Sequence, residues 1–262
     1  GKAKAAKLKI NVIRYAEDFV VTGISKEILE TEVRPWIETY LAQRGLRLSP
    51  EKTRVTHIDE GFDFLGWNFR KYRGTLLIKP SRKNVKAFYD KVVEVIKSHL
   101  MVKQAVLIEK LNPILRGWAQ YHQPVVAKDV FSRLDSLIHW RLQRWARRRH
   151  PQKSRTWCYQ KYWKRLDDRE EFAAVRMTDD GTRQLVRLNL LADTAITRHL
   201  KVKGEYNPFA PKWEVYGEEL RGKRMLQSIG YRKELLSLYL SQSGRCALCG
   251  TAITRETGWH DH

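Results

Sequence analysis

The spacing of apolar residues changes at Pro80, and this change constrains the fold more than any other feature. Before Pro80, apolar and polar residues alternate, as they do from Lys7 to Val12, with the period of two that a half-buried strand requires. After Pro80, apolar residues recur every three or four positions, which is the period of an amphipathic helix. The longest such series is Val130, Leu134, Ile138, Leu142 and Trp145. Strands followed by a block of helices predict the α+β fold class.

The first strands of the chain are predicted to form a hairpin. A β-rich run at residues 19–22 follows the strand that begins at Lys7, and the acidic pair Glu17 and Asp18 lies between the two. Because a tight turn can join antiparallel strands, we expect both carboxylates near the tip of the hairpin.

A helix and further short strands should complete the region before Pro80. Ser25 can cap the helix, Gly45 follows its end, and Pro35 must kink it or start a new one. Strand-like runs punctuated by glycine then follow at residues 54–58, 62–69 and 75–78.

Three helices are predicted between Ser81 and Pro151. Ser81 can cap the first helix, and Asn112 with Pro113 has the residue types of the N-cap and first position of the second. The third carries the apolar series and ends before Pro151. Three amphipathic helices in so short a segment form a small bundle. Residues 151–228 are predicted to be irregular, and the tail after them to hold one helix-like stretch.

Basic residues far outnumber acidic ones, with 50 Lys and Arg against 29 Asp and Glu and a net charge of +21. Such an excess creates a positive field that attracts polyanions and makes their binding depend on salt. A basic surface without a polyanionic partner is the alternative. A membrane partner is not expected, since no run approaches the roughly 18 apolar residues of a spanning helix.

The stretch from Arg133 to Arg165 is the strongest candidate for contacts to nucleic acid. It interleaves basic and aromatic residues, and only Asp135 is acidic. Guanidinium groups pair with phosphates, and flat rings stack on unpaired bases. The residues predicted to make these contacts are Arg141, Arg144, Arg147, Arg148, Arg149, Lys153, Arg155, Trp157, Trp163, Lys164 and Arg165. Alternatively the rings are core anchors and the charges are only solvated, an interpretation that we adopt for Trp145.

Two residue pairs have the chemistry of metal ligands. Glu17 and Asp18 on a tight turn can hold the divalent ions that polymerases use to activate a hydroxyl, although an acidic pair in a turn is usually only solvated. Cys246 and Cys249 have the spacing of half a zinc site. Cys158 is expected to be a packing thiol, because three cysteines do not make a disulfide framework.

Six motifs in order resemble the group II intron-encoded reverse transcriptase/maturase family. Tyr15-Ala16-Glu17-Asp18 stands where that family usually has Tyr-Ala-Asp-Asp. The motifs lie at residues 14–20, 48–53, 64–66, 79–88, 111–122 and 145–151. The resemblance covers roughly residues 1–165, and residues 259–262 resemble the opening of the family's His-Asn-His (HNH) endonuclease module.

The resemblance implies four domains. They are the C-terminal part of a reverse-transcriptase palm (1–78), a helical thumb and maturase bundle called domain X (79–150), a basic DNA-binding region (151–228), and the start of a ββα-metal HNH module (229–262).

The same resemblance implies roles for single residues. Glu17 and Asp18 would be catalytic ligands of Mg²⁺, and Lys52 would lie near the incoming triphosphate. The additional nucleic-acid contacts would be Arg82, Lys83, Lys86 and Arg116. Structural Zn²⁺ would bind Cys246 and Cys249, and a divalent ion of the nuclease, Mg²⁺, would bind His262.

The implied activities are RNA-directed DNA polymerase and DNA endonuclease, beside binding of intron RNA to assist splicing. The implied partners are group II intron RNA and target DNA, with no membrane, in the cytoplasm or nucleoid of a bacterium or in an organelle. Glu17 departs from the family pattern, and the other palm carboxylate and the rest of the nuclease motif are not in the sequence. Both enzymatic sites are therefore expected to be incomplete, with a preceding segment or a second chain supplying the rest of the palm.

Two other interpretations stay open. One is an RNA-binding maturase that acts only in splicing and has a decayed polymerase site. The other is a DNA nuclease subunit with a vestigial palm.

Overall fold

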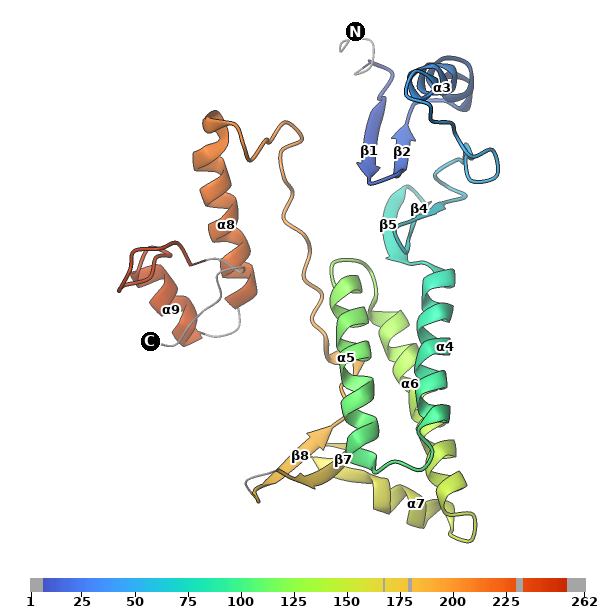
Figure 1. Ribbon diagram of the computed structural model, residues 1–262, viewed down its shortest axis with the longest axis vertical. Helices are drawn as coiled ribbons and strands as arrows, with labels where there is room; N and C mark the ends of the chain where they lie inside the picture. Colours follow the sequence, from blue (N-terminus) through green and yellow to red (C-terminus); the bar gives the residue numbers. More distant parts are fainter. Residues whose placement is uncertain (1–6, 167, 179–180, 230–232, 254–262) are drawn as a thin grey trace. The chain divides into compact units, whose positions relative to one another are not determined.

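The computed structural model describes residues 7–166, 168–178, 181–229 and 233–253. The chain divides into two compact units, Gly1–Ile196 and Thr197–His262, and Figure 1 shows the elements of each. In the part of the chain described, no helix combines the length and the apolar character that crossing a membrane requires.

The predicted N-terminal hairpin is confirmed. Strand β1 (Asn11–Tyr15) pairs antiparallel with β2 (Asp18–Thr22), and Tyr15 is the partner of Asp18. Ala16 in the turn has a φ of 50°. The strand begins at Asn11 and not at Lys7, because Lys9 has a φ of 51° and its backbone leaves the extended region.

The helix after the hairpin bends in the way that its proline requires. Ser25 accepts a hydrogen bond from the backbone of Ile28 and caps α2 (Lys26–Ile28), as predicted. A π-helical turn, Leu29–Val33, leads into α3 (Arg34–Ala42), which has Pro35 in its first turn. Since proline has no N–H to donate, the wider turn before it adapts the helix to the missing bond.

A second antiparallel sheet follows, in the order β3 (Phe62–Phe64), β4 (Trp67–Tyr72) and β5 (Thr75–Pro80). Leu65 and Gly66 between β3 and β4 both have positive φ, 50° and 75°, which is typical of a type I′ hairpin turn. The prediction of a strand at residues 54–58 is wrong, since this segment has no regular structure.

Three long helices form the bundle that the sequence predicts: α4 (Arg82–Ser98), α5 (Gln104–His122) and α6 (Lys128–Arg149). Ser81 caps α4 through a bond from Asn84 N–H. The prediction that Asn112 and Pro113 begin the second helix is wrong, because α5 runs through Pro113. Asn112 instead donates from its side chain to the backbone oxygen of Arg187, so this residue serves the packing of a distant segment.

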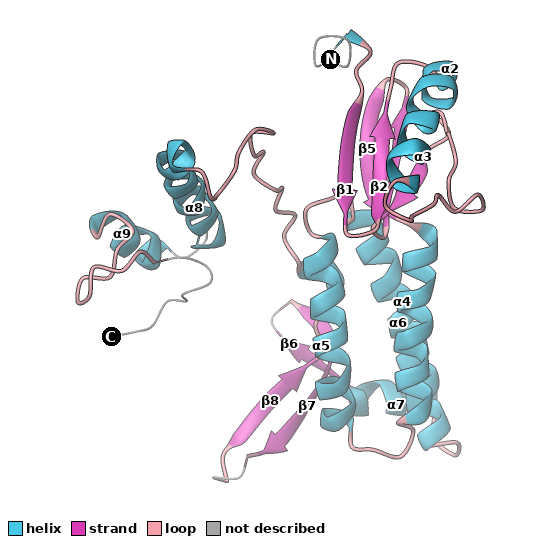
Figure 2. Ribbon diagram, turned by 45° about the horizontal axis from the view of Figure 1, so that its top comes forward, coloured by secondary structure: helices cyan, strands magenta, loops and turns pink. Residues whose placement is uncertain are grey.

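The prediction of irregular structure at residues 151–228 is wrong in two places: 214–228 are helical, and the described part of 151–196 holds a helix and three strands that pack on the bundle (Figure 2). Helix α7 (Arg155–Tyr162) leads into an antiparallel sheet of β6 (Trp163–Leu166), β7 (Arg169–Met177) and β8 (Arg183–Arg187), and a 3₁₀ turn η2 (Leu191–Asp193) follows. One core joins these elements to the helices. Its largest fully buried side chains include Trp145, Phe131, Leu107, Leu142 and Leu191.

The second unit holds a short 3₁₀ turn η3 (Pro211–Trp213) and the helices α8 (Glu214–Ile229) and α9 (Lys233–Ser241). Met225 and Tyr239 are buried together, and Ile253 packs against them. This small core fixes the turn that carries the two cysteines close to α9.

Candidate nucleic-acid interface

From Arg133 onward, one face of α6 is exposed and rich in arginine. Each of its residues lies three or four positions from another member, a spacing that places them on the same side of an α-helix. They are Arg133, Leu137, Trp140, Arg144, Arg147 and Arg148, all exposed. The buried series that includes Leu134, Ile138 and Leu142 lies on the other side. We call the exposed side the α6 face.

Trp140 lies in the middle of the α6 face and is 61% exposed, whereas Trp145 is 2% exposed. Trp140 was not among the residues predicted to contact nucleic acid. The sequence does indicate that Trp140 is exposed. Its position is not part of the apolar series, and it lies four residues before Arg144, on the same side of the helix. An exposed indole ring between guanidinium groups can stack on an unpaired base.

The positive surface continues from the end of α6 onto α7. Arg147 and Arg148 lie in the last turn of α6, where the helix dipole favours cations. The half-buried ring of Trp157 has Lys161 and Lys153 near it, with ammonium nitrogens 4.8 and 5.5 Å from the ring centroid. Burial, and then the neighbouring cations, lower the pKa of His150. Lys161, Arg149 and Lys153 are the cations that add to the effect of burial on the pKa of His150.

Three predicted contacts belong instead to the framework of the fold. Arg149 donates to the backbone oxygens of Leu100 and Val102, at 2.5 and 2.6 Å, and so closes the turn between α4 and α5. Arg141 donates to the hydroxyl of Tyr89 at 2.9 Å and is half-buried. Trp163 is 5% exposed. The prediction that these three side chains contact nucleic acid is therefore corrected. Arg149 and Arg141 are engaged in hydrogen bonds within the bundle, and the ring of Trp163 is packed in its core.

The other predicted contacts lie on the surface. Arg155 begins α7, and Lys164 and Arg165 are exposed on β6. The first turns of α4 present the remaining basic group, of which Lys86 forms an ion pair with Asp90 at 2.6 Å. Its members are Arg82, Lys83 and Lys86, all exposed. Arg116 is exposed on α5.

The carboxylates of Glu17 and Asp18 are exposed at the tip of the first hairpin. Lys52 is exposed in a turn closed by a bond from Thr53 N–H to Ser49 O at 2.9 Å. Among the described residues no group of three or more His, Cys, Asp or Glu side chains could hold a metal ion. Mg²⁺ is usually bound through one or two carboxylates together with waters and substrate phosphates, and Glu17 and Asp18 supply two exposed carboxylates of that kind.

Cys246 and Cys249 lie on one tight turn of the second unit. The backbone N–H of Cys246 donates to Thr251 O, and Gly250 N–H donates to Cys246 O, at 2.8 and 2.9 Å. Hydrogen bonds from Thr251, and then from Cys246, lower the pKa of the Cys249 thiol. Two cysteines on such a turn have the sequence spacing that half of a zinc site uses. His262 lies outside the described residues. Cys158 is buried in the first unit.

A buried hydrogen-bond chain fixes the turn between β3 and β4 to the bundle. Trp67 Nε1 donates to Nδ1 of His122 at 3.0 Å, and the other ring nitrogen of His122 lies 3.0 Å from Asn84 Oδ1. Trp118 Nε1 donates to the same oxygen at 2.8 Å. Nδ1 is therefore an acceptor, so the neutral Nε2–H tautomer is the one that completes the chain. His122 is completely buried, and burial lowers its pKa to about 4.

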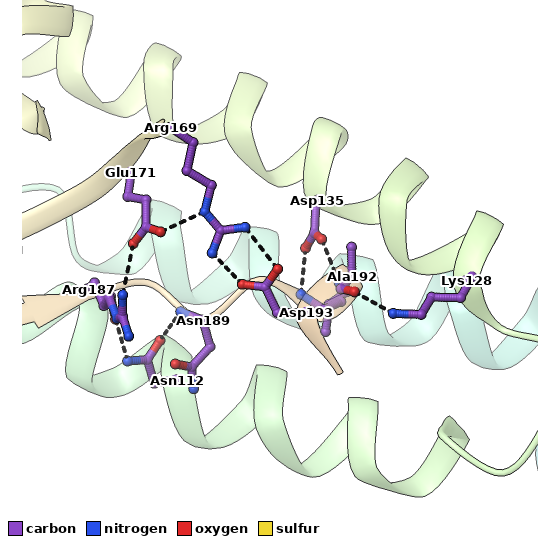
Figure 3. Close-up of polar contacts among 10 residues, drawn as sticks. Asn112, Lys128, Asp135, Arg169, Glu171, Arg187, Asn189, Ala192 and Asp193 are labelled. Carbon is purple, nitrogen blue, oxygen red and sulfur yellow. Dashed lines mark hydrogen bonds and ion pairs between the residues drawn. The ribbon is translucent and has the colours of Figure 1, made fainter. Parts of the chain in front are cut away.

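A second polar network fixes the segment after β8 to the helices (Figure 3). Asp135 accepts from the backbone N–H groups of Leu191 and Ala192, both at 2.9 Å, and Lys128 donates to Ala192 O at 2.6 Å. Asp135, the single acid of the basic stretch, is therefore the anchor of the η2 turn. Burial raises the pKa of this carboxyl.

Comparison with known proteins finds a family match in the segment that forms the helical bundle. Residues 85–163 match the family model described as "Group II intron, maturase-specific domain". Maturase-like protein 1 of Euglena longa is 29% identical over 116 residues, which is 43% of this chain and 25% of that protein. Maturase-like protein 1 of Euglena gracilis is 29% identical over 90 residues, covering 33% and 19%.

The Ribosomal operon-associated A protein of Euglena longa is 22% identical over 217 residues, 80% of this chain and 41% of that protein. The chain thus spans between 19% and 41% of the length of these curated relatives. The matched segment begins in α4, includes α5, α6 and α7, and ends at the first residue of β6. These matches make residues 85–163 similar to the maturase-specific domain of group II introns, and they support a maturase.

Proposed function

We propose that this chain binds group II intron RNA through the α6 face and by that binding assists splicing. The observation that carries the proposal is the exposed series on one side of α6, with Trp140 among four arginines. The helix is held rigidly by its buried side, so the phosphate and base contacts need little reordering when RNA arrives. Neutralised phosphates release counterions, which makes binding strong and dependent on salt.

The proposal is tested by competition. The chain is bound to its own intron transcript, and an unrelated structured RNA of equal length and a duplex DNA of equal charge are used as competitors. A maturase should prefer the intron transcript at physiological salt by at least about tenfold, since specific contacts add to the electrostatic ones. Equal competition by all three would contradict a role in splicing.

We also propose that the first 78 residues belong to a reverse transcriptase palm that is completed by a preceding segment or a second chain. Glu17 and Asp18 at the tip of a hairpin support this proposal. When bound, Mg²⁺ would activate a primer hydroxyl and stabilise the leaving pyrophosphate. Lys52 would contact the incoming triphosphate.

Glu17→Asp should raise the rate of RNA copying by the complete protein at least about tenfold, or about 1.4 kcal/mol of barrier. The reason is that the extra methylene of glutamate displaces a metal ligand by more than about 1 Å, which metal-assisted chemistry tolerates poorly. Primer extension under single-turnover conditions measures the rate. Asp18→Ala is the control, and it should abolish extension in both backgrounds. An unchanged rate for Glu17→Asp would show that this carboxylate does not limit the reaction.

For the second unit we propose a zinc-stabilised nuclease module that acts on the DNA target. The turn of Cys246 and Cys249 supports it. With the other two ligands supplied from outside the described residues, structural zinc would hold the module together.

Changing Cys246 and Cys249 together to serine should remove about one zinc ion per complete protein and unfold this unit, because the binding energy of structural zinc is folding energy. Elemental analysis gives the zinc content, and proteolysis reports the unfolding of residues after Ile196. The buried Cys158 changed to alanine is the matched control and should leave the zinc in place. Protein purified without chelators that contains no zinc would contradict the proposal.

A further inference from the structure

A cleft of about 250 Å³ lies among α5, β7, β8 and the segment that follows β8. Its walls combine apolar and charged side chains. Leu115 and Leu188 lie at its base, 1% and 7% exposed, while Arg116, Arg169, Arg187, Glu171 and Asp193 bring charge to it. Glu171 is 6% exposed, so a buried carboxylate forms part of the lining.

The three arginines of the cleft differ in how far their charge is already neutralised. Arg169 donates to both oxygens of Asp193, at 2.9 and 2.5 Å, and to Glu171 at 2.7 Å. Those bonds raise the pKa of Arg169 and leave its guanidinium satisfied.

Arg187 approaches Glu171 only to 4.0 Å, and its side chain is 59% exposed. Within the described ranges, Arg116 has no ion pair of 4.0 Å or less, and it is exposed. Arg116 and Arg187 are therefore the two cations that can bind an anion from outside.

The cleft is held in its shape before any ligand arrives (Figure 3). Asn112 donates to Arg187 O at 2.9 Å and accepts from Asn189 N–H at 2.8 Å. Asp135 holds the η2 turn at the other end of the same segment. A preformed wall reduces the entropy lost on binding.

The size and charge of the cleft suit a small anionic group. A volume of about 250 Å³ is below the roughly 300–1,000 Å³ of pockets for drug-sized molecules, so the cleft suits a phosphate with part of the nucleotide that carries it. A nucleotide within a duplex is stacked on both sides and stays outside, while an unpaired nucleotide of RNA can turn outward.

We propose that this cleft holds one unpaired nucleotide of the bound RNA, with its phosphate on Arg116 and Arg187. This inference rests on the proposed RNA-binding function and adds a second contact region to it, outside the α6 face.

The test compares two RNAs with three single variants of the full chain. Arg116→Ala and Arg187→Ala should each weaken binding of a single-stranded RNA about tenfold, as expected for a lost charge-assisted hydrogen bond. Neither should change binding of the same RNA annealed to its complement by more than about twofold. Arg183→Ala is the matched control, because Arg183 is exposed at the other end of β8 and does not line the cleft.

Melting curves accompany every variant. Arg187 is held through its backbone oxygen, so its truncation should leave the segment in place, and Arg116 is exposed. Single-strand binding that is unchanged in both variants would overturn the cleft proposal. A parallel Arg144→Ala/Arg147→Ala/Arg148→Ala variant separates the two claims. If that variant is weakened and the cleft variants are not, the cleft proposal alone fails. If neither set is weakened, the proposed RNA interface fails with it.

Discussion

Trp140→Ala should weaken binding of single-stranded RNA by about 1–3 kcal/mol, roughly 5- to 150-fold, while the melting temperature stays the same. A base stacked on an aromatic ring contributes that much free energy. The ring of Trp140 is 61% exposed on the α6 face, so its removal opens no cavity in the core. Stacking involves little counterion release, and the dependence of affinity on salt should therefore hardly change.

Two further variants make this expectation specific. Trp140→Phe keeps a flat ring and should restore most of the affinity. Trp145→Ala removes a ring that is 2% exposed and should destabilise the fold by about 3–5 kcal/mol. Filter binding and thermal unfolding of the three variants give both quantities. A lower melting temperature for Trp140→Ala with normal binding would show that Trp140 only packs.

The bundle should lose roughly 3 kcal/mol of stability between pH 7 and pH 4 through His122 alone. Burial lowers the pKa of His122 from 6.5 to about 4, and each unit of difference corresponds to about 1.4 kcal/mol. The unfolded chain binds a proton on this ring below about pH 6.5, whereas the folded chain stays neutral until about pH 4. Folding stability from this group is therefore complete above pH 6.5 and decreases as the pH falls toward 4.

Urea unfolding at several pH values measures the effect. His122→Gln should be less stable at pH 7, because Trp67 or Asn84 loses part of its hydrogen bonding. Its stability should, however, vary less between pH 6.5 and 4 than that of the wild type. The pKa values of His139 and His150 are also lowered, but both residues are present in both proteins and cancel in the comparison. An identical pH dependence in the variant would contradict the role of His122.

The periodic parts of the fold could be predicted from the sequence because they depend on local patterns. The series through Leu134, Ile138 and Leu142 predicted α6, and Ser25 and Ser81 each cap the helix expected of them. Pro113 misled the prediction, since a proline inside a helix is rare but tolerated when tertiary packing holds the helix. The sheet of β6, β7 and β8 was missed because the core that buries it comes from distant helices.

The sequence predicted which stretch of the chain is basic, but not which of its side chains are free to bind nucleic acid. A run of arginines indicates a surface for phosphate, yet it does not tell which guanidinium groups the fold uses internally. Arg149 is taken up by the carbonyls of Leu100 and Val102, which lie almost fifty positions away. Arg187 gave no signal, because its role depends on a cleft formed by segments distant in the sequence. Long-range contacts of this kind leave no local pattern.

The arginines of the α6 face are proposed to contact phosphate. The most direct test of these contacts is the slope of log affinity against log salt for intron RNA, measured for Arg144→Ala/Arg147→Ala/Arg148→Ala. Each lost phosphate contact should reduce the slope by about 0.7–0.9, so the triple variant should lose about 2.1–2.7 in all. The control is Lys71→Ala/Lys110→Ala/Arg183→Ala, which removes three exposed charges elsewhere and should leave the slope nearly unchanged. Equal slopes for the wild type and the α6 variant would contradict the proposed interface.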